Sequence, residues 1–112
     1  MKFFTNKQAG VKVTPIFENE AYESKLLEYT KERELFSGKL NEVYANLPFN
    51  GEKEILLGFG KKEELVEDKV REVFFKLVKV LESNKELEVF VTLPKVESVS
   101  TEKFVNAAVE GA

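Results

Sequence analysis

A continuous apolar run followed directly by a long amphipathic segment constrains the fold of this sequence most. Residues Glu54 to Phe59 include Ile-Leu-Leu-Gly-Phe, which is typical of a strand buried on both faces. From Lys62 to Glu82 apolar residues recur every three or four positions, and this spacing predicts a helix with one buried face. The residues predicted for that face are Val66, Val70, Val73, Phe74, Leu77, Val78 and Leu81. A further strand is predicted from Leu87 to Leu93, where Pro94 ends it. A strand, a helix and a strand in this order indicate parallel pairing across a crossover, and therefore an α/β fold.

The first third of the chain predicts strands on either side of a short helix. Val11 to Phe17 alternates apolar and polar residues like a half-buried strand, and Pro15 indicates an edge position or a strand end. The opening segment Lys2 to Thr5 is a candidate short strand, with a turn from Asn6 to Gly10. Between Asn19 and Phe36 the pattern predicts a short helix buried around Leu26 and Leu27 and ended by Ser37-Gly38.

Two more elements complete the prediction. A strand from about Asn41 to Leu47 is joined through the turn residues Asn50-Gly51 to the apolar run, which predicts a hairpin. Near the end of the chain, Ser100 or Thr101 can cap a last helix. The apolar face predicted for that helix consists of Phe104, Val105, Ala108 and Val109. Its apolar pattern continues to Gly111-Ala112, so we expect this sequence to be one domain cut from a longer protein.

The amino-acid types that are missing exclude several kinds of chemistry. The chain has no His and no Cys, so it lacks the usual ligands of zinc, copper, haem and iron–sulfur clusters and the usual base of a nucleophilic triad. Only carboxylates, carbonyls and water could hold a metal ion. No disulfide can form, which fits a reducing cytoplasm.

Charge and hydropathy narrow the range of partners. The formal net charge is −3 and the pI is near 5.2, which makes nucleic acid an unlikely partner, although a local basic patch can exist. No apolar run approaches the roughly 18 residues needed to span a bilayer, and the start has no signal-peptide core. We expect a soluble, cytoplasmic protein without a membrane partner.

The segment Gly58-Phe59-Gly60-Lys61-Lys62 lies between a predicted strand and a predicted helix, where open α/β sheets often bind phosphate. A dinucleotide fingerprint would need a third Gly at position 63, which is Glu63 here, and a P-loop would need Gly, Lys and Ser or Thr in sequence. The competing interpretation is a tight turn with close backbone packing, and the sequence favours it.

Four carboxylates begin the predicted long helix: Glu63, Glu64, Glu67 and Asp68. They could form a metal site or an acid–base pair. Carboxylates at a helix N-terminus also stabilise the helix dipole without any ligand, and no nucleophile or electrophile lies nearby in the sequence. The dipole interpretation is therefore favoured.

The ten Phe residues raise the question of a stacking surface for bases. Phe74, Phe90 and Phe104 follow the apolar periodicity and are predicted to lie in the core. Three others flank turns and are predicted to be the more exposed ones: Phe36, Phe49 and Phe59.

Several segments, in this order and spacing, resemble the N-terminal domain of leucyl aminopeptidases, the cytosol aminopeptidase family. They are Phe36-Ser37-Gly38-Lys39, then Asn41-Glu42-Val43, then Ile55-Leu56-Leu57-Gly58-Phe59-Gly60-Lys61-Lys62-Glu63-Glu64-Leu65, and then Asp68-Lys69-Val70-Arg71. Val109-Glu110-Gly111 falls where the family's final Glu-Gly segment should be. The sequence departs from the family at Phe59, where Leu is usual, and at Phe74-Phe75, where Ala is frequent.

The resemblance implies a mixed β-sheet flanked by helices in a macro-domain-like three-layer sandwich, with residues 1–112 as a single N-terminal domain. It implies a parent enzyme that is a cytoplasmic homohexamer and uses two divalent metal ions, zinc or manganese, to release N-terminal residues, preferably Leu, from peptides. The partner of this domain would be its own C-terminal catalytic domain, and its role would be to support hexamer assembly or access to the active sites.

No catalytic, cofactor-binding or metal-binding residue is assigned within residues 1–112, because the resemblance places all of that chemistry in the catalytic domain. Lys39 and Lys61 belong to the N-domain pattern and are not predicted to be catalytic. The alternative function is a macro-like module that binds a nucleotide or ADP-ribose near Gly58 and Gly60. Val105-Asn106-Ala107-Ala108 resembles a macro-domain segment beside ADP-ribose, but it lies late in the chain on a predicted helix, so we interpret it as coincidence.

Overall fold

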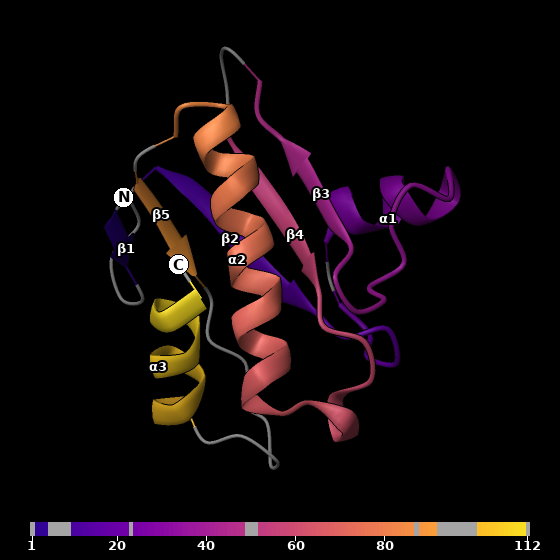
Figure 1. Ribbon diagram of the computed structural model, residues 1–112. Coiled ribbons are helices and arrows are strands. Elements are labelled where there is room, and N and C mark those ends of the chain that lie inside the picture. Colours follow the sequence, from indigo (N-terminus) through magenta and orange to yellow (C-terminus); the bar gives the residue numbers. More distant parts are fainter. Residues whose placement is uncertain are drawn as a thin grey trace.

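The computed structural model describes residues 2–4, 10–22, 24–48, 52–86, 88–91 and 101–111 of the chain. Helices lie on both sides of a central sheet (Figure 1). The elements are β1 (Lys2–Phe4), β2 (Val11–Ile16), α1 (Lys25–Glu32), β3 (Val43–Asn46), β4 (Glu54–Gly58), the 3₁₀ helix η1 (Lys62–Glu64), α2 (Glu67–Ser83), β5 (Glu88–Val91) and α3 (Thr101–Gly111).

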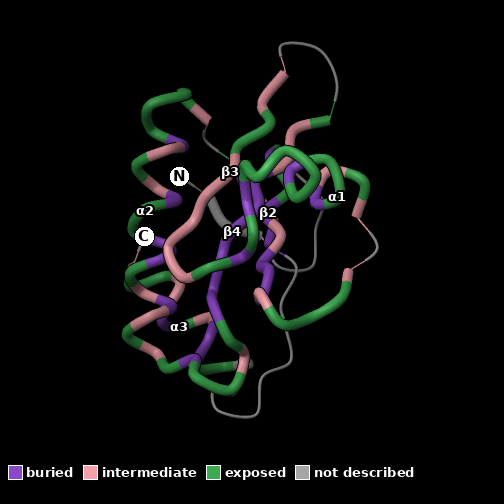
Figure 2. The backbone as a smooth tube through the Cα atoms, turned by 90° about the vertical axis from the view of Figure 1, so that its right-hand side faces the viewer, coloured by how far each residue is buried: buried purple, intermediate pink, exposed green. Residues whose placement is uncertain are grey.

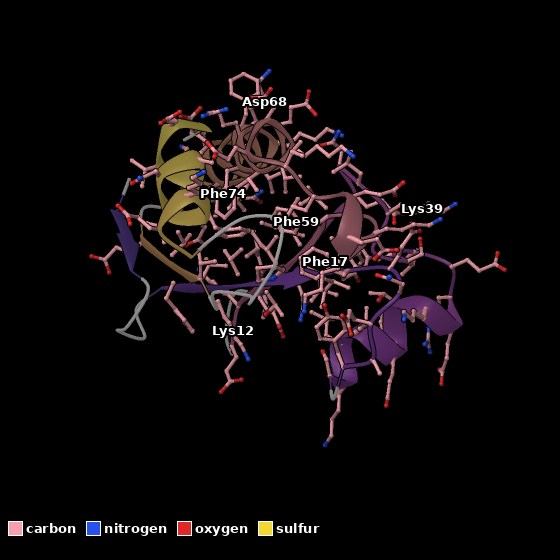
Figure 3. All side chains as sticks on the ribbon, turned by 90° about the horizontal axis from the view of Figure 1, so that it is seen from below. Lys12, Phe17, Lys39, Phe59, Asp68 and Phe74 are labelled. Atoms are coloured by element: carbon pink, nitrogen blue, oxygen red, sulfur yellow. The ribbon has the colours of Figure 1, made fainter. Side chains whose placement is uncertain are left out.

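The sheet has five strands in the order β1-β5-β2-β4-β3. The pairs β1–β5, β5–β2 and β2–β4 are parallel, whereas β3 runs antiparallel to β4. The predicted hairpin is therefore confirmed. The strands before and after α2 are parallel as predicted, but they do not pair with each other, because β2 lies between them. Viewed end-on, α2 and α3 form one layer, the sheet a second, and α1 a third (Figure 3). The predicted mixed α/β sandwich is confirmed.

The face of the sheet under α2 and α3 carries most of the core. Among the described residues, one cluster of sixteen buried side chains fills this side: Val11, Val13, Phe17, Ile55, Leu57, Phe59, Leu65, Val70, Val73, Phe74, Leu77, Leu81, Val89, Val91, Phe104 and Ala107. The ring centroid of Phe59 lies 5.6 Å from that of Phe104 and 6.2 Å from that of Phe74. In Figure 2 the buried residues of β2 and β4 run through the middle of the molecule.

Of the helices in the described part of the chain, α1 is the one that covers the opposite face. Ser24 begins this helix, because its hydroxyl oxygen accepts a hydrogen bond from the Leu27 amide at 3.2 Å. A second cluster of four buried residues, to which α1 contributes Leu27, lies on this side of the sheet: Ile16, Leu27, Phe36 and Leu56. The helix is shorter than the predicted limits of residues 19–36, since the cap fixes its start at Lys25.

Pro15 is not at an edge, because β2 lies between β5 and β4. The alternative of a strand end fits better. Pro15 is the last residue but one of β2, and the described pairing with β5 ends at Val13. Pro15 has no backbone N–H to donate, and it lies beyond the paired part of β2 and β5, where no such donor is needed.

The long helix begins later than predicted. Lys62–Glu64 form a separate 3₁₀ turn, Val66 is extended, and α2 starts at Glu67. Leu65 is fully buried and Val66 is 50% exposed, so the chain anchors itself in the core before the helix begins. The prediction of Val66 as a core residue was wrong, whereas Val70, Val73, Phe74, Leu77 and Leu81 are buried as predicted.

The last helix turns only part of its predicted face inward, and Ala108 packs against the core as predicted. Phe104 is buried, but Val109 is 60% exposed and Ala107 is 1% exposed.

The predicted strand from Asn41 starts two residues later, because Asn41 has a φ of 68° in the left-handed region. Among the described residues, none of the helices is long and apolar enough to cross a membrane.

Candidate functional site

Some of the segments that carry the family resemblance lie against one another. We call this contact the glycine junction: residues 37–42 packed against residues 58–60. The Asn41 amide donates to the Gly58 carbonyl at 3.1 Å, and the Gly60 amide donates to the Gly38 carbonyl at 2.9 Å. A Cβ at Gly58 would lie 2.0 Å from the Lys39 carbonyl oxygen, so no side chain fits there.

The amides that a phosphate would need at this junction are already used. The Gly58 amide donates to the Glu42 carbonyl at 2.7 Å, and the Phe59 amide donates to the Ile16 carbonyl at 2.9 Å. Further along, the Lys62 amide donates to the side-chain oxygen of Asn19 at 3.3 Å. All three glycine-segment residues, 58–60, are buried. The geometry therefore supports the tight-turn interpretation and not a phosphate cradle.

A carboxylate organises the other half of the junction. Glu42 Oε1 accepts hydrogen bonds from the Ser37 hydroxyl at 2.8 Å, the Lys39 amide at 2.8 Å and the Ser37 amide at 3.1 Å. Partial burial alone would raise the pKa of Glu42, but these hydrogen bonds together lower it below its usual value. Sequence reasoning missed this role of Glu42. The signal was present as an acidic residue closely following a Ser-Gly turn.

The four predicted carboxylates are separated by the turn that precedes α2. Glu63 accepts from Asn19 at 2.9 Å, whereas Glu67 and Asp68 both pair with Arg71. In the part of the chain that the structure describes, no group of three or more acidic residues could hold a metal ion. Glu67 and Asp68 begin α2 and so act on the helix dipole, but Glu63 and Glu64 lie before it.

Arg71 ties α3 to α2. Its Nε donates to Glu110 Oε2 at 2.6 Å, in addition to its pairs with Glu67 and Asp68. Gly111 packs on the same turn, where an added Cβ would lie 2.4 Å from the Arg71 carbonyl oxygen. The two helices therefore approach each other closely at the C-terminal end of α3.

The Phe residues do not form a stacking surface in the described chain. Phe36 and Phe59 are 2% and 1% exposed, so their predicted exposure was wrong, and Phe49 lies outside the described residues. The glycine junction folds the turns beside them inward. Figure 3 shows Phe59 pointing with Phe74 into the space between sheet and helices. Phe90, predicted to be core, is only half-buried.

The Val105-Asn106-Ala107-Ala108 segment is part of α3. Ala107 is buried in the core cluster, Ala108 packs against it, and Asn106 is exposed. Among the described residues, this segment therefore serves to pack α3 against the core. Its interpretation as a coincidental match is the one that this placement supports.

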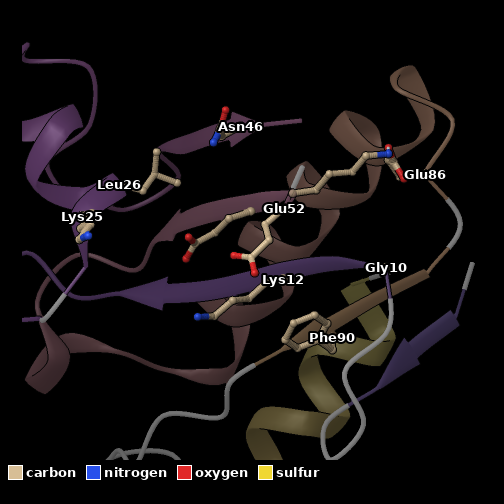
Figure 4. A pocket seen from close by; sticks show the side chains of 10 residues that line it. Gly10, Lys12, Lys25, Leu26, Asn46, Glu52, Glu86 and Phe90 are labelled. Atoms are coloured by element: carbon tan, nitrogen blue, oxygen red, sulfur yellow. The ribbon is translucent and has the colours of Figure 1, made fainter. Parts of the chain in front are cut away.

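A hollow of about 770 Å³ lies on the α1 side of the sheet and is lined by charges of both signs (Figure 4). Its lining comprises Gly10, Lys12, Lys25, Leu26, Asn46, Glu52, Lys53, Glu54, Glu86 and Phe90. Lining residues of the hollow take part in two polar pairs. Thr14 donates to Glu54 at 2.7 Å, and Lys53 pairs with Glu86 at 2.5 Å. Sequence reasoning did not find this hollow, because strands far apart in the chain form it.

Comparison with known proteins identifies related chains. Residues 5–112 match the family model described as "Cytosol aminopeptidase family, N-terminal domain". The chain is 38% identical over 111 residues to a probable cytosol aminopeptidase of Treponema denticola, and 35% identical over 114 residues to one of Clostridium tetani. Each match covers 99% of this chain but only 23% and 24% of the relatives, respectively.

Solved structures share the fold at low sequence identity. The bottromycin maturation enzyme BotP superposes with a TM-score of 0.75 over 94% of this chain and 22% of its own, at 17% identity. A mutant of tomato leucine aminopeptidase superposes with a TM-score of 0.60 over 95% of this chain and 26% of its own, at 15% identity. At these identities the likeness supports the fold alone.

Proposed function

From the premise that this chain belongs to the cytosol aminopeptidase family as its N-terminal domain, we propose that it is the non-catalytic domain of a metal-dependent leucyl aminopeptidase. The observation that carries the proposal is the family match, which extends over residues 5–112. The two curated relatives are probable cytosol aminopeptidases about four times as long as the matched segment. The activity would therefore reside in the part of the protein that follows this domain.

The role of the domain itself would be structural. The family-marking residues Ser37, Glu42 and Gly58 are occupied with one another in the glycine junction. Such a junction fixes a rigid shape rather than a ligand. We propose that this shape supports hexamer assembly of the cytoplasmic parent or limits access of peptides to its active sites.

The metal ions of the parent are not placed in this domain. Family membership implies a metal-dependent peptidase in general, and zinc or manganese at two sites is our proposal for the parent. The described carboxylates do not fit such a site, because Glu67 and Asp68 are bound to Arg71 and Glu63 is bound to Asn19. We therefore assign the ions to the catalytic domain and no step of the reaction to residues 1–112.

The alternative of a nucleotide or ADP-ribose module finds no support in the geometry. Its expected anchor, Gly58 and Gly60, donates its amides to Glu42 and Gly38. Titration calorimetry of the 112-residue chain with ADP-ribose should give no binding at millimolar ligand. Saturable binding would restore this alternative.

Hydrolysis of Leu-p-nitroanilide with added manganese or zinc tests the main proposal. The 112-residue chain should be inactive, and the complete product of the reading frame that encodes it should release N-terminal Leu. Turnover by the 112-residue chain would contradict the non-catalytic role. Inactivity of the complete product with both metals would remove the proposed peptidase function.

A further inference from the structure

The second half of α2 exposes an aromatic side chain that the described domain does not cover. Phe75 is 55% exposed, although its neighbour Phe74 is fully buried. Val78, one turn further on, is half-buried, and the Lys79 ammonium lies 4.6 Å from the Phe75 ring centroid. We call these three residues the α2 stripe. Covering the exposed part of an aromatic side chain is favourable, so the stripe is suited to a packing partner.

The end of α3 points along this stripe. α3 runs in the same direction as α2 beside its first half (Figure 1). Gly111 packs against the backbone of Arg71, which is one helical turn before Phe75. Arg71 and Phe75 are four residues apart and therefore share one side of α2. A chain that continues in the direction of α3 reaches Phe75 and then Val78 in its next turns.

The length of the relatives indicates which segment could cover the α2 stripe. The chain covers only 23–24% of the curated relatives, and the family description places it at the N-terminal side. In a protein built like these relatives, the segment that follows α3 leaves the domain at Gly111. Resting on the proposed function, we infer that this following segment packs on the α2 stripe and so docks the catalytic part against α2. An apolar side chain would cover Phe75, and a carboxylate would suit Lys79.

Thiol labelling can test this contact, because the 112-residue chain has no cysteine of its own. We would make Phe75→Cys and, as a control, Leu35→Cys, since Leu35 is 50% exposed. Both variants would be made in the 112-residue chain and in the complete product of the reading frame. Maleimide reaction at each position would be followed by peptide mass spectrometry, so that other cysteines in the longer product are counted separately.

We expect position 75 to react about tenfold more slowly in the complete product than in the 112-residue chain, with position 35 changed by less than about twofold. Equal rates at position 75 in the two proteins would overturn the inference. Protection at position 75 that is lost on dilution would assign the stripe to a second copy and also overturn it.

Leu-p-nitroanilide hydrolysis by the same complete products separates this inference from the proposed function. Activity with an unprotected position 75 would refute the docking and leave the aminopeptidase proposal standing. Protection at position 75 without activity would support the docking and count against the aminopeptidase proposal.

Discussion

Among the residues that the structure describes, sixteen buried side chains form one cluster between the sheet and the layer of α2 and α3, whereas four form the cluster on the α1 side. Neighbouring residues of β4 show the contrast directly, since Leu57 faces the larger cluster and Leu56 the smaller. On the α1 side, much of the remaining surface is the charged hollow around Lys12 and Phe90. One sheet therefore has a face that holds the fold together and a face that is only partly closed.

The difference teaches that stability and openness are divided between the two faces. The larger face contains a connected group of Phe rings, in which Phe74 and Phe104 meet edge to face at 5.9 Å. The smaller face depends on one short helix and its Ser24 cap. Substitutions on the larger face should unfold the domain, whereas those on the smaller face should mainly loosen α1.

The largest effect is expected from Phe74→Ala, which empties the middle of the larger cluster. Phe74 is fully buried, so the substitution should lower the free energy of unfolding by about 3–5 kcal/mol. Phe75→Ala is the matched control, because Phe75 is 55% exposed, and it should cost less than about 0.5 kcal/mol. Urea unfolding followed by circular dichroism measures both. Similar midpoints for the two variants would show that the larger face does not dominate stability.

A somewhat smaller effect is expected from Gly58→Ala at the glycine junction. The new Cβ would lie 2.0 Å from the Lys39 carbonyl oxygen, so backbone must move, at a cost of about 3 kcal/mol. Gly60→Ala is the control. Its Cβ meets Leu40 at 3.3 Å, and the φ of 73° adds strain of about 1–2 kcal/mol. A Gly58→Ala variant as stable as the wild type in thermal unfolding would mean that the junction is not closely packed.

Leu27→Ala probes the smaller face. Leu27 is a buried residue of α1 and is 3% exposed. Its truncation should lower the free energy of unfolding by about 2 kcal/mol, the lower end for a buried Leu. Hydrogen exchange should show faster exchange of amides in α1 with little change in α2. If amides in both helices lose protection equally, the two faces form one cooperative unit and the comparison fails.

The smallest effect is expected from Glu42→Gln, and it depends on pH. Because the native pKa of Glu42 is lowered, its ionised form stabilises the fold above the unfolded value near 4.5, and this contribution is lost as pH falls through the native pKa. The carboxylate is mostly solvated, so the effect should stay below about 1 kcal/mol near neutral pH and vanish in acid, once the pH has fallen below the native pKa. Urea midpoints of wild type and variant that differ equally at both pH values would contradict this role.

The elements with long or dense apolar patterns could be predicted from the sequence. The periodicity of α2 and the apolar run of β4 dictate their own burial, since few other arrangements hide Leu77 or Leu57. The last helix was harder, because two apolar stripes compete there. Close approach to α2 selects the side with Ala107 and Gly111 and leaves Val109 outside, and that choice depends on a partner distant in sequence.

The sequence predicted the glycine segment at residues 58–60, but it did not predict that residues 37–42 pack against it. The sequence indicates a tight turn at Gly58, yet the partner of that turn, Glu42 with its loop, is set by the tertiary fold. The same contact buries Phe36 and Phe59, which local turn signals had placed at the surface. A turn predicts a change of direction, and it does not predict what the turn packs against.

The edge strand β1 affects how the protein can be made on the ribosome. Lys2 pairs with Glu88 and Phe4 pairs with Phe90, so the first strand of the chain binds the last. At about 5–20 residues per second, roughly 4–17 seconds of synthesis separate these partners. Until β5 has been made, the Phe3-Phe4 start is an unpaired apolar segment on a nascent chain, and β2 and β4 can already pair without it. The β1 segment is therefore a natural place for a chaperone to bind during translation.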